Sequence, residues 1–504
     1  MLFPMSFMLF PTISLRRHGK AEAIQLLETA SAAIGASIGA RRTAKTTTEG
    51  TLPVISPVIE ICDMVLEEGT IEALVNLISI CNTKRTNGSN AEASSSSFPV
   101  TIHITDCSAV WFFWKALAEA LGNCQHVGFY GSCTFLKKSF LEHFLTSARS
   151  GELKSLRIRQ TINHEQVEAL AEGFASNHVL EALDLRASQI GHDVDFGILG
   201  KALRDGCSKI KHLDLLGIQL KNAHLEAMLC DPRVLALPEA RAAPCPMQAL
   251  ESLSLSLKTS VRHHSASLGN FLAHPECRLK TLMIRYKGWE NGIHVGISDI
   301  AQALETNTTL ETLSLPGNSL NNWDAFLLAK AVAKNSSLRY LDVRNNHISD
   351  DGMIQLAEAA HKGTLKELGV GGNPFGIKGS KALLKAASEN HNLLQIDVDV
   401  FSHADKARFI NQKIRYHIAL NRGARRLVHK NFPRSLWPLA MERAQLIAND
   451  ETQEEKYPHF FCRNEDLLYS DVLYFLLREN ATEIFPVLSL SQFVCEELKG
   501  FPEF

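Results

Sequence analysis

Hydrophobic positions follow one repeated template between residues 310 and 375. The three copies read LETLSLPGNSL, LRYLDVRNNHI and LKELGVGGNPF. In each copy two Leu residues three apart are followed by Leu or Val, then Asn, then an apolar residue, at the same offsets. The anchors Leu310, Leu338 and Leu365 lie about 28 residues apart. A fixed period of this length indicates an internal repeat, which decides the fold before any single motif does.

The template predicts a short strand, a turn and a helix in each copy. Alternating apolar residues, such as Leu313 and Leu315, are typical of a strand that buries one side. The Asn follows where the chain turns, and its side chain can bond backbone groups there. Residues 323–334 then show helical spacing. One strand and one helix cannot bury their apolar faces alone, so neighbouring units are expected to stack.

These copies resemble leucine-rich repeats, and the long period with a full helix is similar to the ribonuclease-inhibitor-like subclass. The resemblance implies an α/β solenoid, a horseshoe with a parallel inner β-sheet and outer helices. Less regular copies extend the domain over residues 98–400, and their Asn position holds other residues, such as Thr161. Further anchors of the template are Leu153, Leu180, Ile210, Leu250, Leu279 and Leu393.

The flanking segments predict helices and linkers. Residues 1–53 are expected to be a loosely ordered leader with one helix, and residues 54–82 a helical segment of two short helices. Residues 83–97 are polar and of low complexity, which predicts a linker. Residues 401–504 are expected to form a helical cap and tail, and the tail sequence is similar to the tails of diatom leucine-rich repeat proteins.

Charge and cysteine content indicate which partners and which compartment to expect. The formal net charge of −2 gives no general attraction to nucleic acid or to an acidic membrane. A basic stretch at 406–426 is expected to be the solvated face of a capping helix, with nucleic acid or anionic lipid as the alternatives. The eleven cysteines include no CxxC pair, which favours reduced thiols in a reducing compartment.

The amino-terminal segment allows two interpretations. Its apolar run precedes Arg16 and Arg17, whereas a secretory signal carries its positive charge before the run. The run is short and interrupted by prolines, so no transmembrane segment is expected. Residues 1–48 are poor in acids, which also suits a transit peptide. We therefore expect a cytoplasmic protein, with nuclear or organellar targeting left open.

The strand residues that point away from the core predict a binding surface on the concave side. Charges of both signs together with aromatic rings suit a protein partner, because charge steers approach and Arg or aromatic anchors supply affinity. The alternative is a strand face that is merely solvated. The candidate partner-binding residues are Arg157, Arg159, Asp184, Arg186, Asp214, Arg285, Tyr286, Tyr340, Asp342, Arg344, Asp397 and Asp399.

Catalytic motifs are missing from the sequence. It contains no HExxH, GxSxG or phosphate-binding GxxxxGK[ST] motif and no zinc-ligand spacing. We therefore expect no enzymatic activity, no catalytic residue, no cofactor and no metal, and a protein rather than nucleic acid as partner. Two alternatives stay open: a regulator of a small GTPase, and an adaptor or receptor of a ubiquitin ligase with residues 54–82 or the tail as effector.

Overall fold

The computed structural model divides the chain into two compact units, Met1–Thr312 and Leu313–Phe504. In both, strands and helices alternate along the chain. The residues that the structure describes are 13–16, 19–43, 58–82, 100–109, 113–148, 153–186, 195–230, 245–258, 264–287, 297–398 and 405–422.

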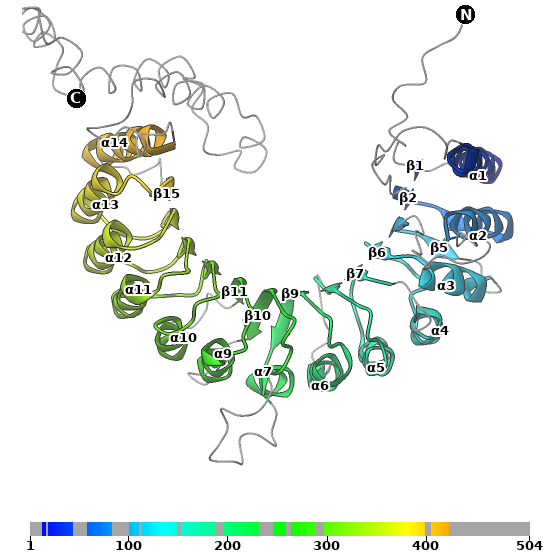
Figure 1. Cartoon of the computed structure of the whole chain (residues 1–504), viewed down its shortest axis with the longest axis horizontal. Coiled ribbons are helices and arrows are strands. Elements are labelled where there is room, and N and C mark those ends of the chain that lie inside the picture. Colours follow the sequence, from blue (N-terminus) through cyan, green and yellow to red (C-terminus); the bar gives the residue numbers. More distant parts are fainter. Residues whose placement is uncertain are drawn as a thin grey trace, which may run out of the picture. The chain divides into compact units, whose positions relative to one another are not determined.

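The first unit is a layer of parallel strands backed by a layer of helices (Figure 1). Its strands, in spatial order, are β1 (Ile13–Arg16), β2 (Val58–Cys62), β4 (Thr101–Thr105), β6 (His126–Tyr130), β7 (Ser155–Arg159), β8 (Ala182–Asp184), β9 (His212–Leu220), β10 (Ser252–Lys258) and β11 (Thr281–Lys287). Its helices are α1 (Lys20–Thr43), α2 (Glu68–Asn82), α3 (Trp114–Gly122), α4 (Lys138–Ala148), α5 (His164–Phe174), α6 (Phe196–Gly206), α7 (Asn222–Leu229), α9 (His264–Ala273) and α10 (Ser298–Leu304). Two short strands, β3 (Val65–Leu66) and β5 (Ser108–Ala109), pair beside this sheet.

The second unit repeats the same arrangement (Figure 1). Its strands are β12 (Thr312–Ser314), β13 (Tyr340–Asp342), β14 (Glu367–Gly369) and β15 (Gln395–Asp397), again in chain order. Its helices are α11 (Asn322–Lys334), α12 (Asp350–Lys362), α13 (Ile377–Glu389) and α14 (Asp405–Arg422). Strand order that follows chain order is what stacked repeats require, since each repeat contacts its sequence neighbours.

Register between strands places the template residues in a buried row. Leu341 of β13 lies beside Leu368 of β14, which lies beside Ile396 of β15, and all three side chains are buried. In the first unit Leu156 lies beside Leu183 in the same way. The α/β leucine-rich repeat solenoid predicted from the sequence is therefore confirmed.

The turn after the strand uses a left-handed backbone in both units. Gly317, Asn345 and Gly372 have φ values of 67°, 55° and 73° in the second unit. Asp63 and Asp106 have φ values of 54° and 50° in the first. Only Gly, Asn and Asp adopt this conformation readily, which explains why these residue types precede the ladder position in the template.

The prediction of two short helices over residues 54–82 is wrong. Strand β2 occupies Val58–Cys62 and pairs in parallel with β4, while α2 begins at Glu68. The period-two alternation that buries Ile59 and Ile61 was mistaken for helical spacing. Because β1 also pairs with β2, strand–helix units begin before residue 98. The linker at 83–97 and the tail from residue 423 onward lie outside the described residues.

Helix α14 covers the last strand–helix pair of the second unit. Its residue Asn421 donates hydrogen bonds from Nδ2 to the carbonyl oxygens of Ala387 and Leu393, at 3.1 Å and 2.9 Å. Its residue Arg422 donates from Nε to the carbonyl oxygen of Leu394 at 2.7 Å. Ala387 lies in the last turn of α13, and Leu393 and Leu394 directly precede β15, so α14 satisfies backbone groups of the last strand–helix pair.

Candidate functional site

The strand face is the side of each strand layer that points away from the helices. In the first unit, Gly128, Arg157, Asp184 and Asp214 occupy the same register position on β6, β7, β8 and β9. Their neighbours along the strands, such as Leu156, are buried on the helix side. The structure thus brings Arg157, Asp184 and Asp214, which the sequence placed on one face, into one row.

Most charges on this part of the strand face compensate each other. Arg159 donates to Asp184, with 2.7 Å between Nη2 and Oδ2. Arg186 donates from Nε to Oδ2 of Asp214 at 2.7 Å and lies 3.7 Å from Asp184. The hydrogen bond to Asp214 raises the pKa of Arg186. These four side chains form a ladder of alternating sign that ties β7, β8 and β9 together.

Two arginines on the strand face of the first unit take no part in this ladder of ion pairs. Arg157 on β7 and Arg285 on β11 are exposed, and neither has an ion-pair or hydrogen-bond partner for its side chain among the residues that the structure describes. An exposed guanidinium without a partner keeps its full capacity for two parallel hydrogen bonds to a carboxylate. These two are therefore the arginines of the first unit's strand face that a partner can use without breaking an existing pair.

Tyr130 forms an aromatic plate next to Arg157. A Cβ atom at Gly128 would lie 2.7 Å from Cε2 and 2.9 Å from Oη of Tyr130, so the missing side chain gives the ring its place. The ring of His103 meets the Tyr130 ring edge-on, with 5.4 Å between centroids. The guanidinium of Arg159 lies 5.6 Å from the Tyr130 centroid, a cation–π contact.

Two histidines flank this plate and were missed from the sequence. His103 on β4 and His126 on β6 are half-buried. Burial lowers the pKa of both. The charge of Arg157 lowers the pKa of His103 further, and the charges of Lys154 and Arg157 lower that of His126 further. The signal that could have identified them is their place at alternate positions in short apolar strands, where Tyr130 also lies.

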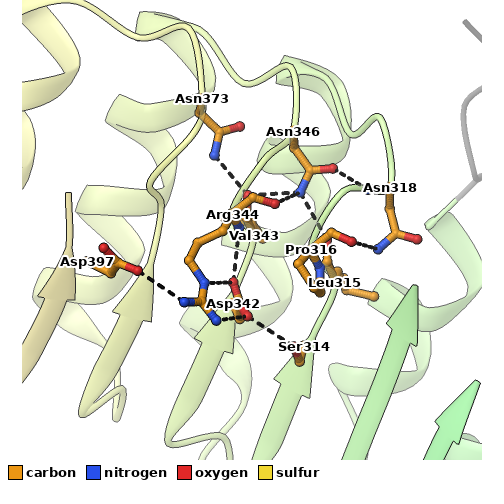
Figure 2. Close-up of polar contacts among 10 residues, drawn as sticks. All are labelled: Ser314, Leu315, Pro316, Asn318, Asp342, Val343, Arg344, Asn346, Asn373 and Asp397. Atoms are coloured by element: carbon orange, nitrogen blue, oxygen red, sulfur yellow. Dashed lines mark hydrogen bonds and ion pairs between the residues drawn. The ribbon is translucent and has the colours of Figure 1, made fainter. Parts of the chain in front are cut away.

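In the second unit the predicted residues pair with one another (Figure 2). Arg344 donates from Nε and Nη2 to Asp342 at 2.9 Å and 2.8 Å, and its Nη1 lies 3.3 Å from Asp397. Ser314 donates to Asp342 at 3.1 Å. Asp342 is only 2% exposed. A Cβ at Gly369 would lie 3.0 Å from Oδ1 of Asp342, so the missing side chain leaves room for the carboxylate that pairs with Arg344.

The hydrogen bond with Asp342 raises the pKa of Arg344. Tyr340 on β13 is half-buried on the strand face. Tyr286 belongs to β11, but its side chain and the whole of Asp399 lie outside the described residues. Of the candidates in the second unit, the structure therefore brings Asp342, Arg344 and Asp397 into one network.

An asparagine ladder holds the turns of the second unit (Figure 2). Asn346 accepts hydrogen bonds at Oδ1 from the backbone N–H groups of Asn318 and Leu320, at 2.8 Å and 3.0 Å. Its Nδ2 donates to the carbonyl oxygens of Leu315 and Val343 at 3.0 Å and 2.8 Å. One buried side chain thus joins two successive turns, as the template predicted for its Asn.

The first unit holds its turns with other side chains. Cys133 donates from Sγ to the carbonyl oxygens of Ile104 and Tyr130 at 3.6 Å and 3.4 Å. Gln160 accepts at Oε1 from the backbone N–H of Cys133 at 3.0 Å. The buried polar residue that accepts a hydrogen bond from the preceding turn is therefore Gln160, one position before the predicted Thr161.

Two further properties describe the residues that the structure covers. No three His, Cys, Asp or Glu side chains of this part of the chain gather as a metal site would need. None of its helices combines the length and the apolar character that crossing a membrane requires.

Comparison with known proteins agrees with this geometry. Residues 290–417 match the family model of the TMOD/LMOD leucine-rich domain. The mouse ribonuclease inhibitor is 27% identical over 207 residues, which cover 40% of this chain. The chain is a leucine-rich repeat protein. Human NACHT, LRR and PYD domains-containing protein 12 is 28% identical over 158 residues, 25% of this chain.

The relatives of this leucine-rich repeat protein match it only in part. The chain spans 42% of the mouse inhibitor and 15% of the human protein, less than half of either. A solved structure titled "Leiomodin-1 Actin-Binding Site 2 (ABS2)" is 23% identical, covers 26% of this chain and 76% of that chain, and has a TM-score of 0.22. The tropomodulin C-terminal domain of Caenorhabditis elegans is 18% identical and has a TM-score of 0.27. The match covers 32% of this chain and 95% of that domain's chain.

Proposed function

We propose that this leucine-rich repeat protein is a non-enzymatic interaction protein that binds another protein through its strand face, the concave side of the predicted horseshoe. The observation that carries the proposal is the contrast on that face between paired and unpaired cations. Arg159 and Arg186 are used in the ladder, whereas Arg157 and Arg285 are exposed and without a partner among the described residues.

Rigid presentation supports this proposal physically. The strand-face side chains sit on hydrogen-bonded strands rather than on loops, so little conformational entropy is lost when a partner docks. Arg and Tyr are among the residue types that most often anchor protein interfaces, and the Tyr130 ring lies over Gly128, the direct neighbour of Arg157 on the next strand. The described cysteines are free thiols, which suits a reducing compartment such as the cytoplasm.

Site-specific photocrosslinking tests the proposal on the full chain. Benzoylphenylalanine is placed at Arg157 or Arg285 on the strand face, or at Lys201 on α6 as the matched control, all within the first unit. We expect the same partner protein to be crosslinked from both strand-face positions and not from Lys201. Crosslinking of that partner from Lys201 alone would contradict the proposal.

The identity of the crosslinked protein also separates the two alternatives. A regulator of a small GTPase would crosslink to a GTPase and accelerate its GTP hydrolysis. An adaptor of a ubiquitin ligase would instead co-purify with ligase subunits through residues 54–82 or the tail, and deletion of that segment would abolish the association. Both alternatives keep a protein as the partner and differ in what its binding leads to.

A further inference from the structure

We infer that the strand face of β4, β6 and β7 receives a carboxylate side chain from an acidic segment of the partner protein. The receiving group is called the Tyr130 site here and consists of His103, His126, Tyr130 and Arg157. This inference rests on the proposed function, because it assigns a chemistry to one part of the proposed binding surface.

Register brings His103 and Arg157 to either side of Gly128, and His126 lies two positions before Gly128 on the same face of β6. His103, Gly128 and Arg157 are direct neighbours across β4, β6 and β7. Parallel strands lie about 4.8 Å apart, so the backbones of His103 and Arg157 are about 10 Å apart with no side chain on the strand between them. The ring and hydroxyl of Tyr130 cover this gap, because a Cβ at Gly128 would lie 2.9 Å from Oη.

The hydrogen-bonding groups of the Tyr130 site are available to a ligand. Neither the Tyr130 hydroxyl nor the Arg157 guanidinium has a hydrogen-bond partner among the described residues. Arg157 is exposed, and Tyr130 and both histidines are partly exposed, so a group presented by another protein can reach them. A hydroxyl, a guanidinium and imidazole N–H groups are all donors, and a carboxylate accepts hydrogen bonds without donating any.

The charge of the Tyr130 site fits one negative charge. Arg159 is already neutralised by Asp184, so Arg157 supplies the uncompensated positive charge. Burial and Arg157 lower the pKa of His103 and His126, which makes both imidazoles neutral donors near pH 7. Glu60 lies beside His103 on β2 and opposes a second negative charge. This balance favours the carboxylate of Asp or Glu over a doubly charged phosphoryl group.

Fluorescence anisotropy with the full chain tests the inference. Three fluorescein-labelled peptides of equal length share one Gly-Ser background and carry Glu, Gln or phosphoserine at the same positions. We expect the Glu peptide to bind at least tenfold more tightly than the Gln peptide. Arg157→Gln should lower the affinity for the Glu peptide about tenfold, and Tyr130→Phe about threefold, since charged hydrogen bonds are the stronger ones.

Lys201→Gln is the control, because Lys201 is exposed on α6 of the first unit, outside the strand face, and its loss should leave peptide affinity unchanged. Thermal melting verifies that Arg157→Gln folds, as expected for a side chain without a partner in the described residues. The inference is overturned if the Glu and Gln peptides bind equally, if the phosphoserine peptide binds most tightly, or if Arg157→Gln and Lys201→Gln have equal effects.

The two proposals can fail separately. If benzoylphenylalanine at Arg157 crosslinks the partner but the Glu peptide has no advantage over the Gln peptide, the carboxylate inference is wrong and the strand-face proposal stands. If crosslinking occurs only from Lys201, the strand-face proposal is wrong whatever the peptides show.

Discussion

The two units solve the same problem at the turn with different side chains. In the second unit, Asn346 offers one acceptor and two donors and joins backbone groups of two repeats. In the first unit, Cys133 and Gln160 divide these tasks, and the thiol makes longer contacts. The backbone groups that end each strand need partners in either unit. The same turn position therefore needs hydrogen-bonding side chains in both units. The Asn of the template meets this need with a single side chain.

Thiols can fill the ladder because they stay protonated. Burial raises the pKa of Cys107 to about 11, and it raises the pKa of Cys133 as well. Cys107 donates from Sγ to the carbonyl oxygens of Ile61 and Thr105 at 3.5 Å and 3.2 Å. An S–H group is a weak donor, so each such contact stabilises the turn less than an amide does.

The two units also differ in how many of their strand-face charges are paired. A glycine on a strand makes room in both, for the Tyr130 ring at Gly128 and for the Asp342 carboxylate at Gly369. In the second unit the carboxylate in that space pairs with Arg344, which leaves the network compensated. In the first unit a neutral ring fills the room, and Arg157 remains unpaired within the described residues. The first unit therefore carries the more available binding groups.

The largest loss of stability is expected when the asparagine ladder is broken. Asn346→Ala should destabilise the second unit by about 3 kcal/mol, because two buried N–H groups lose their acceptor and two carbonyls lose a donor. Cys133→Ala should cost the first unit only about 1 kcal/mol. Hydrogen exchange of the amides at residues 318–320 and 131–133, with chemical unfolding, measures both. Equal losses would contradict the difference drawn between the two ladders.

Replacing a paired arginine should lower the free energy of unfolding more than replacing an unpaired one, and this is the next largest effect. Arg344→Ala should destabilise the second unit by about 2 kcal/mol, because Asp342 stays buried without its cation. Arg157→Ala should change stability by less than about 0.5 kcal/mol, since its side chain is exposed and unpaired among described residues. Urea unfolding of both variants provides the comparison, and a clear loss for Arg157→Ala would show that it has a structural role.

The smallest effect concerns pH and the first unit. Burial lowers the pKa of His103, His126 and His224 below the ordinary value of 6.5. Between the lowered pKa values and pH 6.5, the unfolded chain binds more protons than the folded chain. The contribution of these histidines to the free energy of unfolding is therefore full above pH 6.5 and falls as the pH drops below it. Melting at pH 7.5 and 5.5 should show a decrease of about 2 °C or more for the first unit.

His126→Gln should reduce this decrease, since one of the three groups no longer titrates. The pKa values of Glu181 and Glu251 are lowered from 4.5 by hydrogen bonds from Lys211 and Lys280. Their contribution is therefore lost only at more acidic pH and does not overlap with the histidine window. An unchanged melting temperature between pH 7.5 and 5.5 would contradict the assignment.

The sequence alone determined the repeat, most of its strands and helices, and part of the set of residues that share the strand face. These features depend on periods of two and 3.6 residues and on turn residues within one repeat, so neighbouring positions encode them. The same reasoning failed at Val58–Cys62, where a short apolar run fits either period. It succeeded for the Asn positions because three copies share one offset.

Only the tertiary structure decided which of these residues are available to a partner. Whether Arg157 stays unpaired while Arg344 is held by Asp342 depends on side chains from neighbouring repeats and on the room that a glycine leaves. Gly128 and Arg157 meet across two strands, and such contacts are set by parallel register rather than by local pattern. Electrostatic pairing is a property of distance in space, and the distance along the chain does not give it.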